Sequence, residues 1–180
     1  MSALPEGLTQ GTWNLDAAHT SVGFTIRHAG ISKVRGTFGE VTGTLEVGSD
    51  LESLRFDATM QVASVDTGNA DRDGHLKSAD FFDAAQYPTM TFVTREVTKK
   101  EIKGELTLHG VTKEVELDYE FEGTATDPFG VYRAGFSGET TISRKEFGLT
   151  YNAALEAGGV MLSDAVKIII EAEFVAPTAA

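Results

Sequence analysis

The feature that most constrains this chain is an alternation of apolar and polar residues that recurs in run after run along it. In the segment 21–28, Val22, Phe24 and Ile26 share one face, while mostly polar residues share the other. The segment 114–122 alternates most sharply, with a carboxylate at every second position. Because successive side chains of a strand point to opposite faces, each run predicts a strand that buries one face. We count about eight or nine such strands.

Strands with one apolar face can bury it in a sandwich or in a closed barrel. The run 33–47 is too long for an ordinary strand, and its pattern slips by one residue at Gly39. We interpret this slip as a β-bulge within one long strand. Long bulged strands favour a barrel, and nineteen glycines beside four prolines suit a β protein with many bends. We therefore predict an all-β fold in which about eight antiparallel strands close into a barrel.

One stretch, residues 67–87, interrupts the alternation. Four of its residues fall on one side of a helix: Arg72, His75, Ala79 and Phe82. Asn69 suits the N-cap position, and acidic residues follow it where the helix dipole favours them. We predict one short helix over about 69–83 between two β halves.

Charge and composition exclude several classes of function. A net charge of −12 argues against binding nucleic acid or an anionic membrane through bulk electrostatics. The chain has no cysteine, so thiolate nucleophiles and Cys-ligated metals are excluded. The N-terminus lacks the pattern of a secretory signal and no apolar run is long enough to span a bilayer, which predicts a cytoplasmic protein without a transmembrane segment. We expect a flexible leader over 1–10, one domain over 11–176 and a tail over 177–180.

The inward face of the predicted barrel combines large apolar side chains with glycines and alanines. A barrel of about eight strands can be filled by its own side chains or can hold one small ligand. The small residues remove volume from the interior and favour a ligand-holding lumen, whereas glycines at barrel corners with neighbours filling the space are the alternative. The predicted lumen residues are Val22, Phe24, Ile26, Phe38, Phe56, Met60, Phe92, Leu106, Leu108, Phe121, Phe136, Ile168 and Ile170.

The residues give little sign of catalytic or metal chemistry. The four histidines are scattered along the chain, and none forms a pair with the spacing of a metal site. No nucleophile elbow and no phosphate-binding loop is present, so we predict no catalytic residue, no metal and no enzymatic activity. His28, Arg72 and His75 are the candidates for meeting a ligand head group at the mouth of the lumen.

Several motifs together resemble the YceI-like family of polyisoprenoid-binding proteins. They occur in the family's order and span about residues 12 to 175. The motifs are DAAHTSVGF at 16–24, SVDTG at 64–68, RDGHL at 72–76, DFFD at 80–83, YP at 87–88, GELTLHGVT at 104–112, RKEFG at 144–148 and DAV at 164–166.

The resemblance implies an extended, lipocalin-like barrel that carries or stores a long apolar lipid in its lumen. Such a ligand is a polyisoprenoid, an isoprenoid quinone or a fatty-acid-like chain, and no other cofactor is implied. Two alternatives stay open from the residues: a small-molecule enzyme that uses histidines at the lumen mouth, and an acidic protein-interaction module with a packed barrel. A homodimer also stays open.

Overall fold

The computed structural model describes residues 1–153, 155 and 159–178 and is dominated by one antiparallel sheet. The single α-helix of these residues, α1, covers Ala70–Lys77, and short 3-10 turns occupy Ala17–His19 (η1), Leu51–Ser53 (η2), Val62–Ser64 (η3) and Arg144–Phe147 (η4). No helix of the described residues is long and apolar enough to cross a membrane. The strands are β1 (Gly11–Leu15), β2 (Ser21–His28), β3 (Ser32–Phe38), β4 (Val41–Val47), β5 (Arg55–Gln61), β6 (Val65–Asp66), β7 (Thr89–Val97), β8 (Glu101–Leu108), β9 (Val111–Thr126), β10 (Tyr132–Ser143) and β11 (Leu162–Val175).

Eight of these strands close into a ring, as the alternation predicts. The neighbours run β1-β4-β5-β7-β8-β9-β10-β11, and β1 pairs back onto β11. Only two register positions make that last pairing, Asn14 with Val175 and Leu15 with Phe174. The sequence-based prediction of an eight-stranded antiparallel barrel is therefore confirmed.

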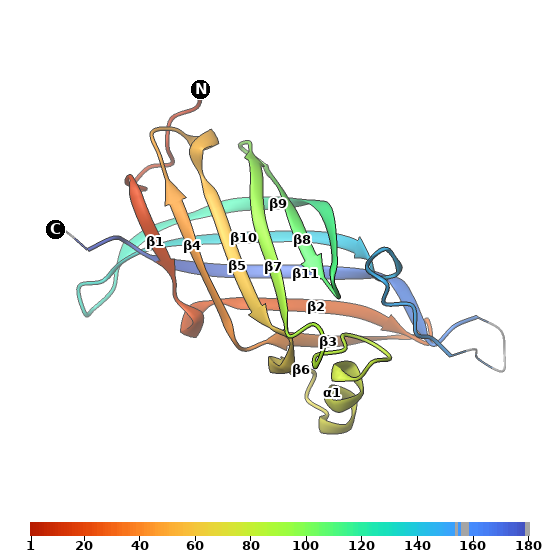
Figure 1. The fold of residues 1–180 in the computed structure, drawn as a ribbon. Coiled ribbons are helices and arrows are strands. Elements are labelled where there is room, and N and C mark those ends of the chain that lie inside the picture. The colour runs from red at the N-terminus through yellow and green to blue at the C-terminus, as the bar shows by residue number, and fades with distance from the viewer. Residues whose placement is uncertain (154, 156–158, 179–180) are drawn as a thin grey trace.

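The other three strands extend the sheet beyond the ring. β2 pairs with the same edge of β11 that β1 uses, and η1 separates β1 from β2. The next strands are interrupted in the same way, because β4 pairs with β1 while β3 pairs with β2. In Figure 1, β1, β4, β5 and β7 cross β9, β10, β11 and β2 at a steep angle. One end of the barrel wall is thus built from separate strand segments.

The prediction of a single bulged strand over 33–47 is wrong. The chain changes pairing partners at Gly39, whose N–H donates to the carbonyl of Ser64. Gln61 likewise donates to the carbonyl of Glu40 just beyond the break. The one-residue slip in the pattern therefore marks a corner between β3 and β4 and not a bulge.

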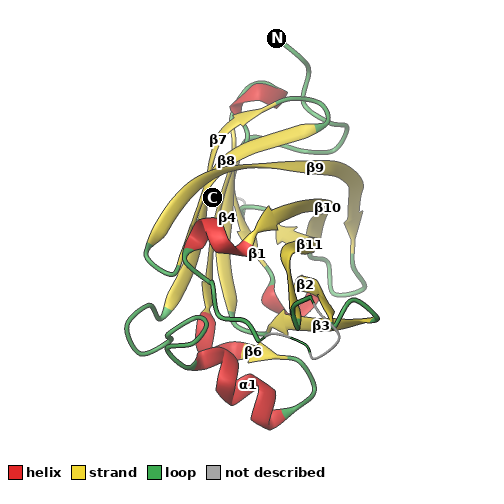
Figure 2. Ribbon diagram, turned by 90° about the vertical axis from the view of Figure 1, so that its right-hand side faces the viewer, coloured by secondary structure: helices red, strands yellow, loops and turns green. Residues whose placement is uncertain are grey.

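The helix begins where the sequence predicts and ends sooner. The side chain of Asn69 accepts a hydrogen bond from the N–H of Arg72, so Asn69 is the N-cap. The helix stops at Lys77 because Ser78 is extended (φ −75°, ψ 171°) and donates its hydroxyl proton to the carbonyl of His75. The predicted range of 69–83 is too long, and residues 78–83 form turns that carry two phenylalanines to the barrel. Figure 2 shows α1 at one end of the barrel beside β6.

Two buried clusters hold the barrel together, and the N-terminal residues join one of them. Trp13, Leu45 and Leu54 are fully buried in the first cluster, which closes the barrel end away from α1. Leu8 is only 5% exposed and packs in the same cluster, while the carbonyl of Ser2 accepts from the N–H of Leu51. The prediction of a flexible leader over 1–10 is corrected by these contacts. The predicted tail, 177–180, lies partly outside the described residues.

We expect Gly43→Ala to destabilise the barrel. A methyl group at Gly43 would lie 2.4 Å from the backbone oxygen of Asp57 on the neighbouring strand, so the backbone itself would have to shift. Such overpacking costs about 1–3 kcal/mol. Thermal unfolding should show a midpoint several degrees below that of the wild type.

Gly39→Ala is the matched control, because nothing lies within 4 Å of a methyl group at that position. Its unfolding free energy should stay within about 0.5 kcal/mol of the wild type. Equal midpoints for the two variants would contradict the close approach of β4 and β5 at Gly43.

Candidate ligand-binding cavity

The barrel encloses a cavity of about 410 Å³ whose wall is mainly aliphatic and aromatic. The alternation of the strands decides which side chains reach it. All but one of the residues predicted to face the lumen line this cavity: Val22, Phe24, Ile26, Phe38, Phe56, Met60, Phe92, Leu106, Leu108, Phe136, Ile168 and Ile170. That these residues bind a ligand stays a prediction.

Phe121 is the exception, although its side chain is on the inward face. It pairs with Phe136 and alternates in phase with Tyr119, and both of these residues line the cavity; the extra residue on β9, Glu122, comes only after it. The ring of Phe121 packs against that of Phe136 at a centroid distance of 5.2 Å and does not line the cavity. Phe121 therefore faces inward and supports the wall through Phe136, and only its prediction as a residue that lines the lumen is corrected.

The small inward residues divide into two kinds. A methyl group at Gly36 would lie 2.4 Å from the ring of Phe24, and one at Gly104 would lie 2.4 Å from the ring of Phe92. Those two glycines make room for rings, as the alternative interpretation of the glycines predicts. Ala58, Gly138 and Ala172 instead line the cavity. Aromatic rings therefore fill the volume beside Gly36 and Gly104, whereas the volume beside the other three small residues belongs to the cavity.

The exposed lining residues gather at one end of the cavity, which identifies its mouth. The side chain of His75 is 44% exposed, and Tyr151 and Met161 are 39% and 36% exposed. The rings of His75, Phe81 and Tyr151 form a triangle with centroid distances of 5.0 to 5.1 Å. This contact joins α1 to the segment that follows η4.

The three predicted head-group residues, His28, Arg72 and His75, all line the cavity. The guanidinium of Arg72 turns back onto its own segment, where Nε donates to the hydroxyl and Nη2 to the carbonyl of Thr67 at 2.7 and 2.8 Å. Nε2 of His75 lies 2.8 Å from a carboxylate oxygen of Asp80. Local partners thus occupy much of the polar capacity of Arg72 and His75.

Sequence reasoning missed Arg144, the buried cation of the cavity wall. The residue is 3% exposed, and burial lowers the pKa of its guanidinium while nearby Asp164 opposes that effect. Its hydrogen bonds within the described part of the chain all go to backbone carbonyls, namely those of Ser163, Leu149, Tyr151 and Leu162. Arg144 therefore ties the segment at the mouth to the start of β11. The RKEFG motif marks its position, but a charge after a strand gives no sign of burial.

The remaining two histidines lie apart from the mouth cluster. Nδ1 of His109 is 3.1 Å from the carbonyl oxygen of Phe147, and its ring packs on Tyr87. Nδ1 of His19 is 2.8 Å from a carboxylate oxygen of Asp16. The four histidines therefore do not form one constellation at the lumen.

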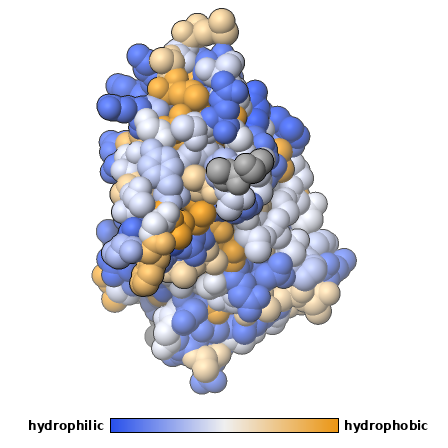
Figure 3. All heavy atoms as spheres, turned by 90° about the vertical axis from the view of Figure 1, so that its left-hand side faces the viewer, coloured by the Kyte–Doolittle hydropathy of each residue, from blue (hydrophilic) through white to orange (hydrophobic). Residues whose placement is uncertain are grey.

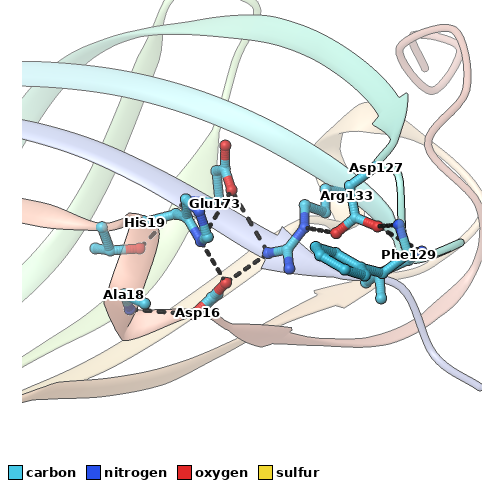
Figure 4. Close-up of polar contacts among 9 residues, drawn as sticks. Asp16, Ala18, His19, Asp127, Phe129, Arg133 and Glu173 are labelled. Atoms are coloured by element: carbon cyan, nitrogen blue, oxygen red, sulfur yellow. Dashed lines mark hydrogen bonds and ion pairs between the residues drawn. The ribbon is translucent and has the colours of Figure 1, made fainter.

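An ion-pair network on the barrel exterior centres on Arg133. Figure 4 shows Arg133 between Asp16, Asp127 and Glu173. Asp16, His19 and Glu173 also place possible metal-ligand atoms within 4.8 Å of one another. The guanidinium of Arg133 already contacts the carboxylates of Asp16, Asp127 and Glu173. A cationic side chain therefore occupies the position that favours positive charge. We interpret the group as an ion-pair network.

The network lowers the pKa of two of its carboxyl groups. Hydrogen bonds from His19 and then from Arg133 lower the pKa of Asp16 below its usual value of 3.8. Hydrogen bonds from the N–H of Val131 and then from Arg133 lower the pKa of Asp127. Both groups favour the folded state while they are ionised.

Comparison with known families agrees with the motifs of the sequence. A family model described as the YceI-like domain matches residues 13–174. The chain belongs to the YceI-like family. A UPF0312 protein of Staphylococcus epidermidis is 42% identical over 164 residues, which cover 90% of this chain and 96% of that protein. A UPF0312 protein of Staphylococcus aureus is 40% identical over the same length.

Solved structures share the YceI-like fold. A Campylobacter jejuni YCEI protein is 32% identical and superposes with a TM-score of 0.70 over 97% of this chain and 100% of its own. Burkholderia cenocepacia BcnA gives a TM-score of 0.75 at 20% identity, covering 88% and 98% of the two chains. A polyisoprenoid binding domain from Saccharophagus degradans gives 0.71 at 16% identity, covering 92% and 98%. The latter two likenesses concern the fold.

We expect Arg144→Met to destabilise the YceI-like barrel by about 3 kcal/mol, because carbonyl groups at the mouth lose a charged donor. Lys145→Met is the control, since Lys145 is exposed on the same turn. Thermal unfolding should separate the two variants by several degrees. An Arg144→Met variant as stable as the control would contradict the anchoring role of Arg144.

The Arg133 network predicts a dependence of stability on pH. Because the folded pKa values of Asp16 and Asp127 are lowered, their contribution is present above the unfolded value of about 3.9 and is lost as pH falls through the folded values. Arg133→Met should therefore lower the unfolding midpoint at about pH 7, and the gap to the wild type should narrow at about pH 3.

Arg95→Met is the control for this pH series, because Arg95 pairs with Glu105 on the exposed surface. Exposed pairs contribute about 0–1 kcal/mol, so the control should differ little from the wild type. A gap for Arg133→Met that stays constant across the pH range would count against the network.

Proposed function

We propose that this YceI-like chain binds a long apolar lipid in the barrel cavity and carries or stores it without catalysing a reaction. The observation that supports this function is the cavity itself, whose wall is mainly aliphatic and aromatic. Its volume of about 410 Å³ falls within the range usual for ligand sites. The lipid class comprises polyisoprenoids, isoprenoid quinones and fatty-acid-like chains.

The energetics of such binding come mainly from the hydrocarbon. Each buried methylene contributes roughly 0.8 kcal/mol, so about ten methylenes contribute about 8 kcal/mol before the ordering of the chain is subtracted. Affinity in the micromolar range then needs no charged contact. His28, at the mouth, is a polar group that a head group could meet, whereas Arg72 and His75 already have local partners.

The comparisons support the same class of ligand. The structure from Saccharophagus degradans is described as a polyisoprenoid binding domain, and its fold matches this chain with a TM-score of 0.71. The packed-barrel alternative has less support, because it requires an interior that side chains fill. The enzyme alternative lacks a shared constellation of histidines, since His109 and His19 lie in contacts of their own.

Native mass spectrometry of gently purified protein tests the proposal. We expect a bound mass that matches an isoprenoid or fatty-acid lipid. Ile168→Glu should weaken binding of cis-parinaric acid, a fluorescent fatty acid, about 100-fold, because it replaces an apolar contact on the wall with a charge. Ile168→Trp provides a second variant that reduces the cavity volume without adding charge.

Ile169→Glu is the matched control, because the neighbouring side chain on the same strand is 43% exposed. It should bind the probe about as tightly as the wild type. Circular dichroism confirms that each variant is folded. A bare chain in the mass spectrum, together with equal probe binding by folded variants at positions 168 and 169, would rule out the lumen as the lipid site.

A further inference from the structure

The hairpin between β2 and β3 carries an exposed apolar tip beside the cavity mouth. Ala29 and Gly30 both have positive φ, +53° and +72°, and close the turn. Ile31 follows the turn and is 85% exposed. The N–H of Ala29 donates to the carbonyl of Met161 at 2.6 Å, so the segment before β11 lies against the turn. We call Ile31, Val160 and Met161 the apolar tip; the latter two are 53% and 36% exposed.

The apolar tip is continuous with the entrance to the cavity. Met161 belongs to the tip and also lines the cavity. His28, which pairs with Leu162 across β2 and β11, lines it too. In Figure 1, this hairpin and the start of β11 lie on the same side of the molecule, away from both termini. A surface that bound the tip would therefore lie next to the mouth.

The outer face of the hairpin is basic, although the chain as a whole is acidic. Residues 21–38 contain no aspartate or glutamate. Arg27, Lys33 and Arg35 are exposed and alternate with residues that line the cavity, so they share the outer face. Among the described residues, none of the three has a carboxylate ion-pair partner. Within the part of the chain that the structure describes, the hairpin thus presents positive charge without a carboxylate partner.

Two of these charges oppose each other directly. Arg27 and Lys33 occupy paired positions across the two strands. Like charges in that position destabilise a hairpin unless a third group neutralises them. On β11, Lys167 pairs with Thr25, which itself pairs with Arg35, but Lys167 has a carboxylate partner, Glu139, at 3.6 Å and adds no free charge to the face. An anionic partner outside the chain would remove the repulsion.

We infer that the β2–β3 hairpin docks the protein on an anionic lipid bilayer, with Ile31 inserted at the interface and the cavity mouth turned toward the membrane. Basic residues around an exposed apolar side chain fit a bilayer better than they fit DNA or an acidic protein, because only the bilayer offers hydrocarbon beneath the negative charges. Exchange of lipid with the cavity at this site rests on the proposed function, whereas docking itself does not.

The net charge of −12 is compatible with this orientation. Charges farther from the surface than about 8–10 Å are largely screened at physiological salt, so the hairpin determines the interaction at contact. The anionic bilayer repels the rest of the protein surface, which is acidic. This repulsion favours an approach in which the apolar tip faces the membrane. Figure 3 shows the opposite side of the molecule, where hydrophilic atoms surround smaller hydrophobic patches. Phe129, 92% exposed in the turn between β9 and β10, is an apolar side chain remote from the mouth.

Sedimentation with vesicles tests the basic face. We expect the full chain to bind phosphatidylcholine vesicles that contain phosphatidylglycerol, and to bind pure phosphatidylcholine far less. Lys33→Gln/Arg35→Gln should weaken binding about 30-fold, since each basic residue near an anionic surface contributes about 1 kcal/mol. Lys99→Gln/Lys100→Gln removes the same charge from the turn between β7 and β8 and should bind within about twofold of the wild type. Equal losses for the two double variants would overturn the proposal, as would stronger binding to DNA than to the vesicles.

A second pair of variants tests insertion of the tip. Ile31→Ser should weaken vesicle binding about tenfold, because an isoleucine in the interface buries most of its side chain. Phe129→Ser removes an exposed side chain of similar character elsewhere and should have no effect. Equal binding by Ile31→Ser and wild type would overturn insertion. Binding of cis-parinaric acid in vesicle-free buffer is measured for every variant, so failure of the cavity to bind lipid is distinguished from failure to dock.

Discussion

The pairing of β1 with β11 is the contact on which the rest of the structure depends. It joins the first strand to the last through Leu15 and Phe174 and their neighbours, and without it the sheet would have two open edges. Closure also fixes where Trp13 is buried, in the hydrophobic cluster at the barrel end away from α1. Because β2 continues along the same edge of β11, the opposite end cannot close in the same way. The cavity mouth is therefore a consequence of how the ring is completed.

Arginines show how differently one residue type is used around this scaffold. Arg144 is buried and binds backbone carbonyls, so it fixes the conformation of the mouth. Arg133 is partly exposed and binds carboxylates, which links η1 to the turn between β9 and β10. Arg27 has no ionic partner among the residues that the structure describes, and its opposition to Lys33 is tolerated at the hairpin. The same residue type thus stabilises the mouth, joins two segments through ion pairs, and presents an exposed charge at three different positions.

Much of the fold and most of the cavity wall could be predicted from the sequence, because a period of two assigns each residue of a strand to one face. Phe24 and Ile168 are examples, since each needs only the phase of its own strand. The phase also places Phe121 on the inward face, but whether its ring reaches the cavity depends on how it packs against Phe136, which the phase does not give. The corner at Gly39 imitates a bulge because a change of pairing partner also shifts the pattern by one residue. The burial of Arg144 depends on carbonyls that tertiary structure brings together.

The interrupted strands also divide the barrel into parts of unequal stability. Strands in the closed ring are paired on both edges, whereas β6 pairs only with β3, and through only two positions. Amide protons in this extension are shielded by fewer neighbours, and local opening free energies are lowest where such contacts are sparse. The wall beside the mouth is therefore the part of the barrel that we expect to open at the lowest free energy, well below that of global unfolding.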